Sequence, residues 1–100
     1  MINLHLAFLN VGIYIVQEGD TLISIAQKFS SSKELIAKEN FLKGEVRVGE
    51  YLLVRRYEKV FTVGVEDTVS SVAKALGVSE EELLRINKTD RIYPFMQVVK

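Results

Sequence analysis

The hydrophobic pattern changes its period within residues 13–29. Residues 13–16, Ile-Tyr-Ile-Val, form a short β-branched and aromatic run that is typical of a strand. The next apolar residues recur at i, i+3, i+4 and i+7, as along one face of a helix: Leu22, Ile25, Ala26 and Phe29. Between the two elements, Gly19 can adopt backbone angles that other residues avoid, and Asp20 can accept hydrogen bonds from helix amides. The pattern predicts a strand that turns sharply into a helix capped by Asp20, with several backbone amides near the surface.

This strand and helix occur twice, at a constant offset of 47 residues. The pattern from Tyr14 to Phe29 returns from Phe61 to Leu76, and the later pair Asn40 and Asn87 keeps the same offset. After Asn87 the register slips by one residue, so that Val46 corresponds to Ile92. Each copy predicts strand, helix, helix and strand, with antiparallel strands and both helices on one face. We therefore expect an α+β protein, with module 1 at residues 13–56 and module 2 at residues 57–100.

Capping residues are predicted at the ends of these helices. Asp67 begins the first helix of module 2, as Asp20 does in module 1, and Gly77 ends it. The second helix of module 2 begins at Ser79, which has capping-box spacing to Glu82.

In module 1 the second helix begins at Ser31, which has the same spacing to Glu34, or alternatively at Ser32. Asn40 ends this helix, either as a left-handed cap or by bonding its own backbone to hold the following loop.

Residues 1–12 lie outside the repeat. Apolar and other residues alternate there with the period of a half-buried strand: Ile2, Leu4, Leu6 and Phe8. We expect an additional strand that packs on module 1 or on a partner chain and offers an edge for self-association. The alternative is a degenerate export segment, although a basic n-region and an unbroken apolar core are missing.

Composition excludes several classes of function. The formal net charge is zero, which argues against nucleic acid as a partner. The chain has no cysteine and a single histidine, His5, so we expect no metal site, no cofactor and no nucleophilic catalysis. Three consecutive acids at residues 80–82 suit the first turn of a helix better than a hydrolytic pair. No apolar run is long enough to span a membrane.

The ordered set of motifs resembles the LysM module, a small β-α-α-β domain of bacterial, fungal and plant proteins. The resemblance rests on the aromatic-x-Val opening, Gly-Asp-Thr-Leu at residues 19–22, Ile-Ala at 25–26, Asn40, and Gly49 before a final apolar strand. It covers residues 13–100. The absence of cysteine favours a bacterial type. Similar modules are attached to cell-wall hydrolases, but the two copies fill this stretch, so we expect no enzyme activity.

The resemblance implies a non-catalytic protein that binds polymers containing N-acetylglucosamine, such as peptidoglycan or chitin. The groove of module 1 would have one wall formed by Gly19, Asp20, Thr21 and Leu22, and a second formed by Asn40, Phe41, Leu42 and Lys43. A neutral acetylated sugar needs exposed backbone donors and acceptors beside small apolar patches, and a glycine-bearing turn can supply the amides. Each groove residue also has a structural interpretation, as a helix cap or as core.

Module 2 departs from the pattern at its turns. Glu66 replaces Gly19, and Phe95 and Met96 replace Gly49 and Glu50. We therefore expect module 2 to be a degenerate copy that supports module 1. Its weaker second site would consist of Asp67, Thr68, Asn87 and Lys88.

A second hypothesis comes from another class of function. Without a clear signal peptide, the chain would be cytoplasmic or associated with the spore or cell envelope of a bacterium. It resembles, in that respect, spore-assembly proteins with LysM-like modules. The alternative function is therefore a protein–protein scaffold without strong glycan binding.

Overall fold

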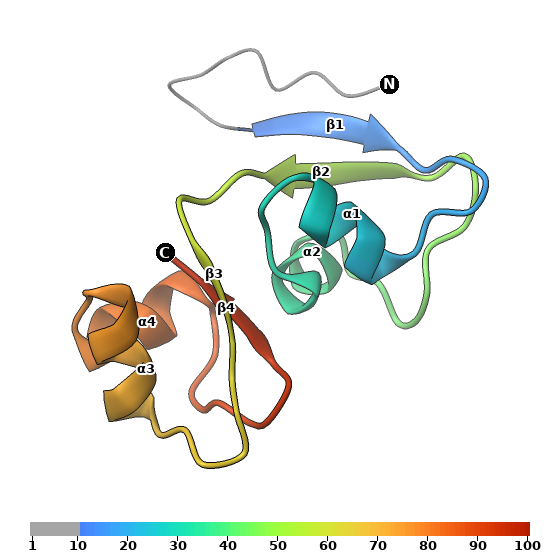
Figure 1. The fold of residues 1–100 in the computed structure, drawn as a ribbon. Helices are drawn as coiled ribbons and strands as arrows, with labels where there is room; N and C mark the ends of the chain where they lie inside the picture. The colour runs from blue at the N-terminus through green and yellow to red at the C-terminus, as the bar shows by residue number, and fades with distance from the viewer. Residues whose placement is uncertain (1–10) are drawn as a thin grey trace. The chain divides into compact units, whose positions relative to one another are not determined.

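Each copy of the repeat folds as strand, helix, helix and strand in the computed structural model, which describes residues 11–100 (Figure 1). Module 1 contains β1 (Val11–Ile15), α1 (Leu22–Lys28), α2 (Lys33–Glu39) and β2 (Tyr51–Arg55). Module 2 contains β3 (Val60–Thr62), α3 (Val69–Leu76), α4 (Glu80–Ile86) and β4 (Gln97–Val99). The chain divides into two compact units, one ending at Tyr57 and the other running from Glu58 to Lys100. The α+β prediction is confirmed.

Strand β1 begins earlier than the repeat pattern indicated. Val11 and Gly12, which the pattern placed in the N-terminal extension, pair with Arg55 and Val54 of β2. The additional strand expected within residues 1–10 lies outside the described residues.

Both sheets have the antiparallel pairing that the sequence predicts. Tyr14 lies opposite Leu52 in module 1, and Phe61 lies opposite Val98 in module 2. These pairs are equivalent only if one residue is skipped in the second copy, which confirms the slip in register.

Each module has its own small core between its sheet and its two helices. In module 1 the buried face of the sheet meets the apolar stripe of the helices, with the cluster formed by Tyr14, Val16, Ile25, Ala26, Phe29, Ile36, Leu52 and Val54. The rings of Tyr14 and Phe29 meet edge to face, with centroids 5.2 Å apart. In module 2 the cluster is formed by Val63, Val72, Ala73, Leu76, Leu83, Met96 and Val98.

The predicted N-caps of the first helices are wrong by one residue. Thr21 is the N-cap of α1: its hydroxyl accepts from the Ser24 amide at 3.1 Å, and the Ser24 hydroxyl accepts from the Thr21 amide at 2.9 Å. Asp20 instead accepts from the amide of Gln17 at 2.8 Å and thereby closes the preceding turn. The Asp20 carboxylate could accept hydrogen bonds from amides of the preceding turn or of the helix. Because the Thr21 hydroxyl caps the helix, the carboxylate stabilises the turn.

Module 2 repeats this arrangement. Thr68 is the N-cap of α3 and accepts from the Ser71 amide at 3.1 Å, whereas Asp67 accepts from the Gly64 amide at 2.7 Å. The predicted Asp67 cap is therefore also wrong. Gly77 ends α3 in the left-handed conformation, at φ 73°, as predicted.

The second helices begin as the sequence indicated. Ser32, the alternative to Ser31, is the N-cap of α2 and accepts from the Leu35 amide at 3.2 Å. Ser79 is the N-cap of α4 and accepts from the Glu82 amide at 3.0 Å.

Asn40 has a different structural role from both predicted ones. Its backbone is not left-handed, at φ −111°. Its side-chain amide donates to the carbonyl groups of Ile36 and Leu53, both at 2.8 Å, and its oxygen accepts from the Leu53 amide at 2.7 Å. Asn40 therefore joins the end of α2 to the outer edge of β2, thirteen residues further along the chain. We call this arrangement the asparagine clamp.

Candidate functional site

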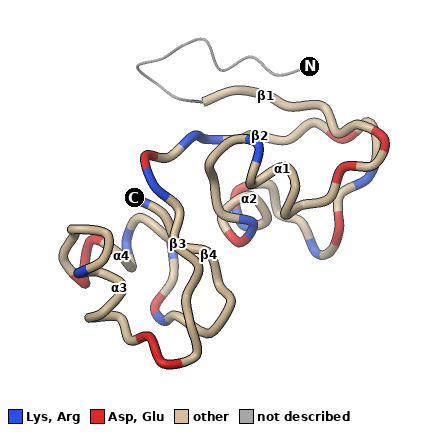
Figure 2. The backbone as a smooth tube through the Cα atoms, viewed as in Figure 1, with Lys and Arg blue, Asp and Glu red and all other residues tan. Residues whose placement is uncertain are grey.

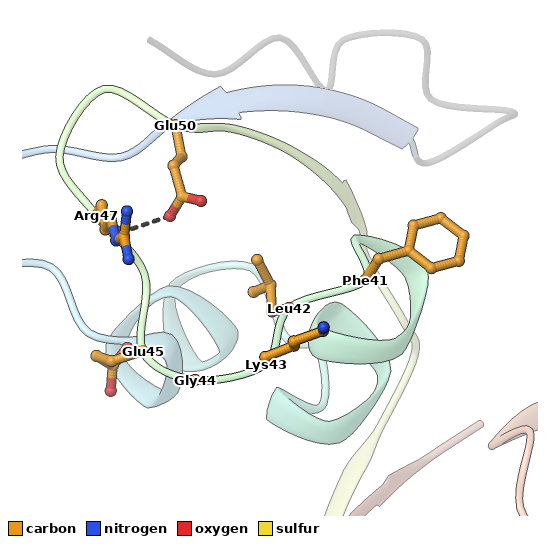
Figure 3. Close-up of a pocket in the computed structure, with 7 residues that line it drawn as sticks. All are labelled: Phe41, Leu42, Lys43, Gly44, Glu45, Arg47 and Glu50. Atoms are coloured by element: carbon orange, nitrogen blue, oxygen red, sulfur yellow. Dashed lines mark hydrogen bonds between the residues drawn. The ribbon is translucent and has the colours of Figure 1, made fainter.

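A hollow of about 410 Å³ lies beside the segment that connects α2 to β2 in module 1 (Figure 3). Its lining residues belong to that segment: Phe41, Leu42, Lys43, Gly44, Glu45, Arg47 and Glu50. Basic and acidic residues are interspersed along this segment (Figure 2), so the hollow has mixed charge and no single-sign field. Its size is in the range of sites for small ligands.

The second predicted wall lies at this hollow. Phe41, Leu42 and Lys43 line it. Asn40 is not among the lining residues, and its side chain forms the asparagine clamp with Leu53. Leu42 is half-buried and packs against the core of module 1, and Lys43 is exposed.

Phe41 combines an exposed ring with an unfavourable backbone. It is 90% exposed and has a φ of 55°. The amide of Phe41 donates to Lys38 at 3.3 Å and that of Leu42 to Ala37 at 2.9 Å, the two hydrogen bonds of a Schellman motif. Glycine usually occupies this position, because the left-handed backbone costs a residue with a side chain about 1–2 kcal/mol in conformational strain. Figure 3 shows the ring directed outward from the loop.

The first predicted wall, residues 19–22, begins at the end of a tight turn. The Asp20 amide donates to the Gln17 carbonyl at 3.1 Å, and Gly19 has a φ of 85°. No atom lies within 4 Å of the place where a Cβ on Gly19 would stand, so glycine is needed there for its conformation and not for space. Gly19 and Thr21 are exposed, and Leu22 is half-buried against the core.

A buried hydroxyl fixes the carboxylate of this turn. The Tyr14 hydroxyl donates to Asp20, and Tyr14 itself is buried. Burial, together with the hydrogen bond to Asp20, raises the pKa of Tyr14 to about 12. The same hydrogen bond, with that from the Gln17 amide, lowers the pKa of Asp20. Asp20 is therefore an ionised structural acceptor that stabilises the turn.

One side chain connects the two predicted walls. The Glu45 carboxylate accepts from the Leu22 amide at 2.5 Å and from its neighbour Val46 at 3.0 Å. Glu50, also in the hollow, accepts from the Arg47 amide at 2.5 Å. Neither glutamate was among the predicted site residues. The sequence pattern around Gly49 did not mark Glu45 or Glu50 as site residues, because the amides that they bind depend on how the loop is folded.

Three of the four residues predicted for the weaker second site make structural hydrogen bonds in module 2. Asp67 and Thr68 hold the turn and the cap of α3, and Asn87 forms a second asparagine clamp. Lys88 is exposed at φ 51°, equivalent to Phe41.

The turns of module 2 form without their glycines. The Asp67 amide still donates to the Gly64 carbonyl at 3.2 Å, and Glu66 is not among the residues with positive φ. Phe95 takes the place of Gly49 with a φ of 70°. The scaffold of module 2 is thus complete despite the two replacements.

Two general features of the described residues 11–100 bear on function. They contain no group of three His, Cys, Asp or Glu side chains that could hold a metal ion. None of their helices is long and apolar enough to cross a membrane.

Comparison with protein families finds the LysM domain twice, at residues 14–54 and 61–99. Among solved structures, the chain is similar to the spore cortex-lytic enzyme SleL of Bacillus megaterium QM B1551, with 26% identity, a TM-score of 0.44, and coverage of 88% of this chain and 22% of that one. The chain is also similar to the spore cortex-lytic enzyme SleL of Bacillus cereus, with 22% identity, a TM-score of 0.45, and coverage of 90% of this chain and 22% of that one. A third similar structure is the ectodomain of a receptor like kinase, with 18% identity, a TM-score of 0.37, and coverage of 98% of this chain and 59% of that one. The chain thus spans 22% of the length of either SleL structure. No curated protein matches.

Proposed function

The chain belongs to the LysM family, with two LysM domains, and we propose that it is a non-catalytic protein that binds N-acetylglucosamine-containing glycan mainly through module 1. LysM domains generally bind peptidoglycan or chitin. The observation that carries the proposal for this chain is the hollow of about 410 Å³ beside the α2–β2 segment. It has an aromatic ring at its margin and balanced charge, which suit an uncharged acetylated sugar.

Phe41 is the residue that we assign to ring contact with the sugar. A side chain that is 90% exposed contributes little to the core, yet it occupies a left-handed position that glycine fills more favourably. Such local strain at an exposed residue is typical of functional positions. An aromatic face offers an apolar surface on which a pyranose ring can pack.

The test separates binding from stability with Phe41→Gly. This variant should bind soluble chito-oligosaccharide or peptidoglycan fragments about tenfold more weakly, since about 1.4 kcal/mol corresponds to a factor of ten. Its free energy of unfolding should stay the same or rise, because glycine relieves the backbone strain. Lys88→Gly makes the same backbone change in module 2 and is the matched control.

NMR titration of the intact chain would follow each module separately. Shifts should concentrate on residues 19–22 and 41–50 in the wild type and Lys88→Gly. Unchanged affinity in Phe41→Gly would refute the role of the ring. Shifts of equal size around Glu66 and Gly19 would refute the assignment of binding mainly to module 1, and no titration by either glycan would refute the proposed function.

A second candidate function, as a protein–protein scaffold, is favoured by one observation. The face of β1–β2 opposite the core carries exposed apolar residues, with Ile13 at 46% and Tyr51 at 72% exposure. Retention on insoluble peptidoglycan or chitin, competed by free oligosaccharide, would support the glycan-binding proposal. No retention, together with self-association that is lost when residues 1–10, which precede β1, are deleted, would support the scaffold.

A further inference from the structure

The carboxylate of Glu45 lies between the two sides of the proposed glycan groove. A single oxygen, Oε1, accepts from the Leu22 amide at 2.5 Å and from the Val46 amide at 3.0 Å. Leu22 and Glu45 are 23 residues apart in the sequence, so this hydrogen bond joins the start of α1 to the loop that lines the hollow. Leu22 belongs to the first predicted wall, where the turn at the start of α1 was expected to offer backbone amides to a sugar.

We propose that Glu45 is an intramolecular latch that sets the glycan affinity of module 1. The inference rests on the proposed function. A sugar acetamide or hydroxyl oxygen that accepts from the Leu22 amide must first displace the carboxylate. A hydrogen bond to an ionised acceptor is stronger than one to a neutral acceptor. Replacing the carboxylate with a neutral sugar oxygen therefore costs free energy and lowers the affinity for the sugar.

Neighbouring charged side chains do not share this contact. Glu50, the other carboxylate in the hollow, accepts from the Arg47 amide at 2.5 Å and so belongs to the turn before β2. Glu45 is itself exposed, so water can solvate its carboxylate once a ligand displaces it from the Leu22 amide. The open arrangement that a latch requires is therefore accessible.

Module 2 shows the same loop without a latch. The slip in register places Arg91 at the position of Glu45. A guanidinium has no hydrogen-bond acceptor, so it cannot bind the amide of Val69, the counterpart of Leu22. Arg91 pairs instead with Asp90 at 3.1 Å. The latch is therefore a property of module 1 and not of the shared scaffold.

Three variants of the intact chain test the latch: Glu45→Ala, Glu45→Gln and Glu18→Ala. Glu45→Ala should bind chito-oligosaccharide about tenfold more tightly. Without the carboxylate, the Leu22 amide is no longer occupied in the unliganded protein, so a larger fraction of the molecules can bind the sugar. Glu45→Gln keeps a neutral acceptor and should lie between it and the wild type. Glu18→Ala removes one exposed negative charge from the neighbouring turn and should bind as the wild type does. Hydrogen exchange of the Leu22 amide should be faster in Glu45→Ala without ligand.

The outcomes separate the latch from the proposed function. Equal or weaker binding by Glu45→Ala, with binding by the wild type intact, would overturn the latch alone. The same gain in Glu18→Ala would overturn it as well, since net charge would then be the cause. If no variant binds glycan, the proposed function fails and the latch fails with it, whatever the Leu22 amide shows.

Discussion

Replacing Asn87 with alanine should remove most of the stability of module 2. The Asn87 side chain donates to the carbonyl groups of Leu83 at 2.8 Å and Val99 at 3.0 Å, and accepts from the Val99 amide at 2.8 Å. Asn87 is only 1% exposed, and Val99 is fully buried. The substitution therefore leaves two backbone groups of β4 without a partner in an apolar environment.

The magnitude follows from these contacts. A buried polar group that loses its hydrogen bond costs about 1–3 kcal/mol, so the two groups of Val99 cost about 2–6 kcal/mol. The Leu83 carbonyl retains the helical bond from the Asn87 amide at 3.2 Å and adds little. We expect a loss of about 3 kcal/mol. A module of roughly 40 residues has about 2–6 kcal/mol of stability in all, so the loss is comparable to the whole.

The clamp of module 1 provides the matched comparison. Asn40→Ala removes the same three hydrogen bonds, but Asn40 and its partner Leu53 are half-buried, so water can replace them in part. We expect a loss of about 1–2 kcal/mol. Urea unfolding followed by the amide signals of Leu53 and Val99 would report each module separately.

Two results would refute this reasoning. A loss of less than about 1 kcal/mol in Asn87→Ala would show that the freed groups of Val99 find other partners. A larger loss in Asn40→Ala than in Asn87→Ala would show that burial does not set the cost of breaking the clamp.

Four further changes have defined outcomes. Phe95→Gly should leave the free energy of unfolding within about 1 kcal/mol or raise it in a thermal melt, because Phe95 is 70% exposed at φ 70°; a larger loss would show that the ring packs. Since the pKa of Tyr14 is raised to about 12 in the fold, stability should fall from pH 10 to 12 by about 1.4 kcal/mol per pH unit, and Tyr14→Phe should remove this slope in pH-dependent urea unfolding. The lowered pKa of Asp20 has the opposite sign: its stabilisation is complete above about pH 4 and is lost on further acidification, except in Asp20→Asn. Thr68→Ala should cost about 1 kcal/mol in urea unfolding, whereas Thr68→Ser, which keeps the cap, should cost less.

Features set by near neighbours in the chain could be predicted from the sequence. The change of period after residue 16 placed β1 and α1, and the repeat placed the corresponding elements of module 2. Gly19 and Gly77 were recognised as left-handed positions because few other residues tolerate that backbone. The slip in register after Asn87 was visible as a change in residue spacing, and the pairing of β3 with β4 confirmed it.

Other roles depended on groups far apart in the chain. Asp20 and Thr21 could each cap α1, and the folded turn decided the choice: Asp20 accepts from the Gln17 amide, as Asp67 does from the Gly64 amide in module 2, where Phe61 has no hydroxyl to offer. The clamp of Asn40 needed β2 beside the end of α2.

Two LysM domains, their elements and the order of those elements could be predicted from the chain alone, because periodicity, turn residues and capping hydroxyls act within a few positions of one another. Tertiary structure alone decided that Phe41 is exposed while Leu42 packs inward, and that Glu45 meets the Leu22 amide. The physical reason is that a hydrogen bond across 23 residues exists only once packing has brought its donor and acceptor together.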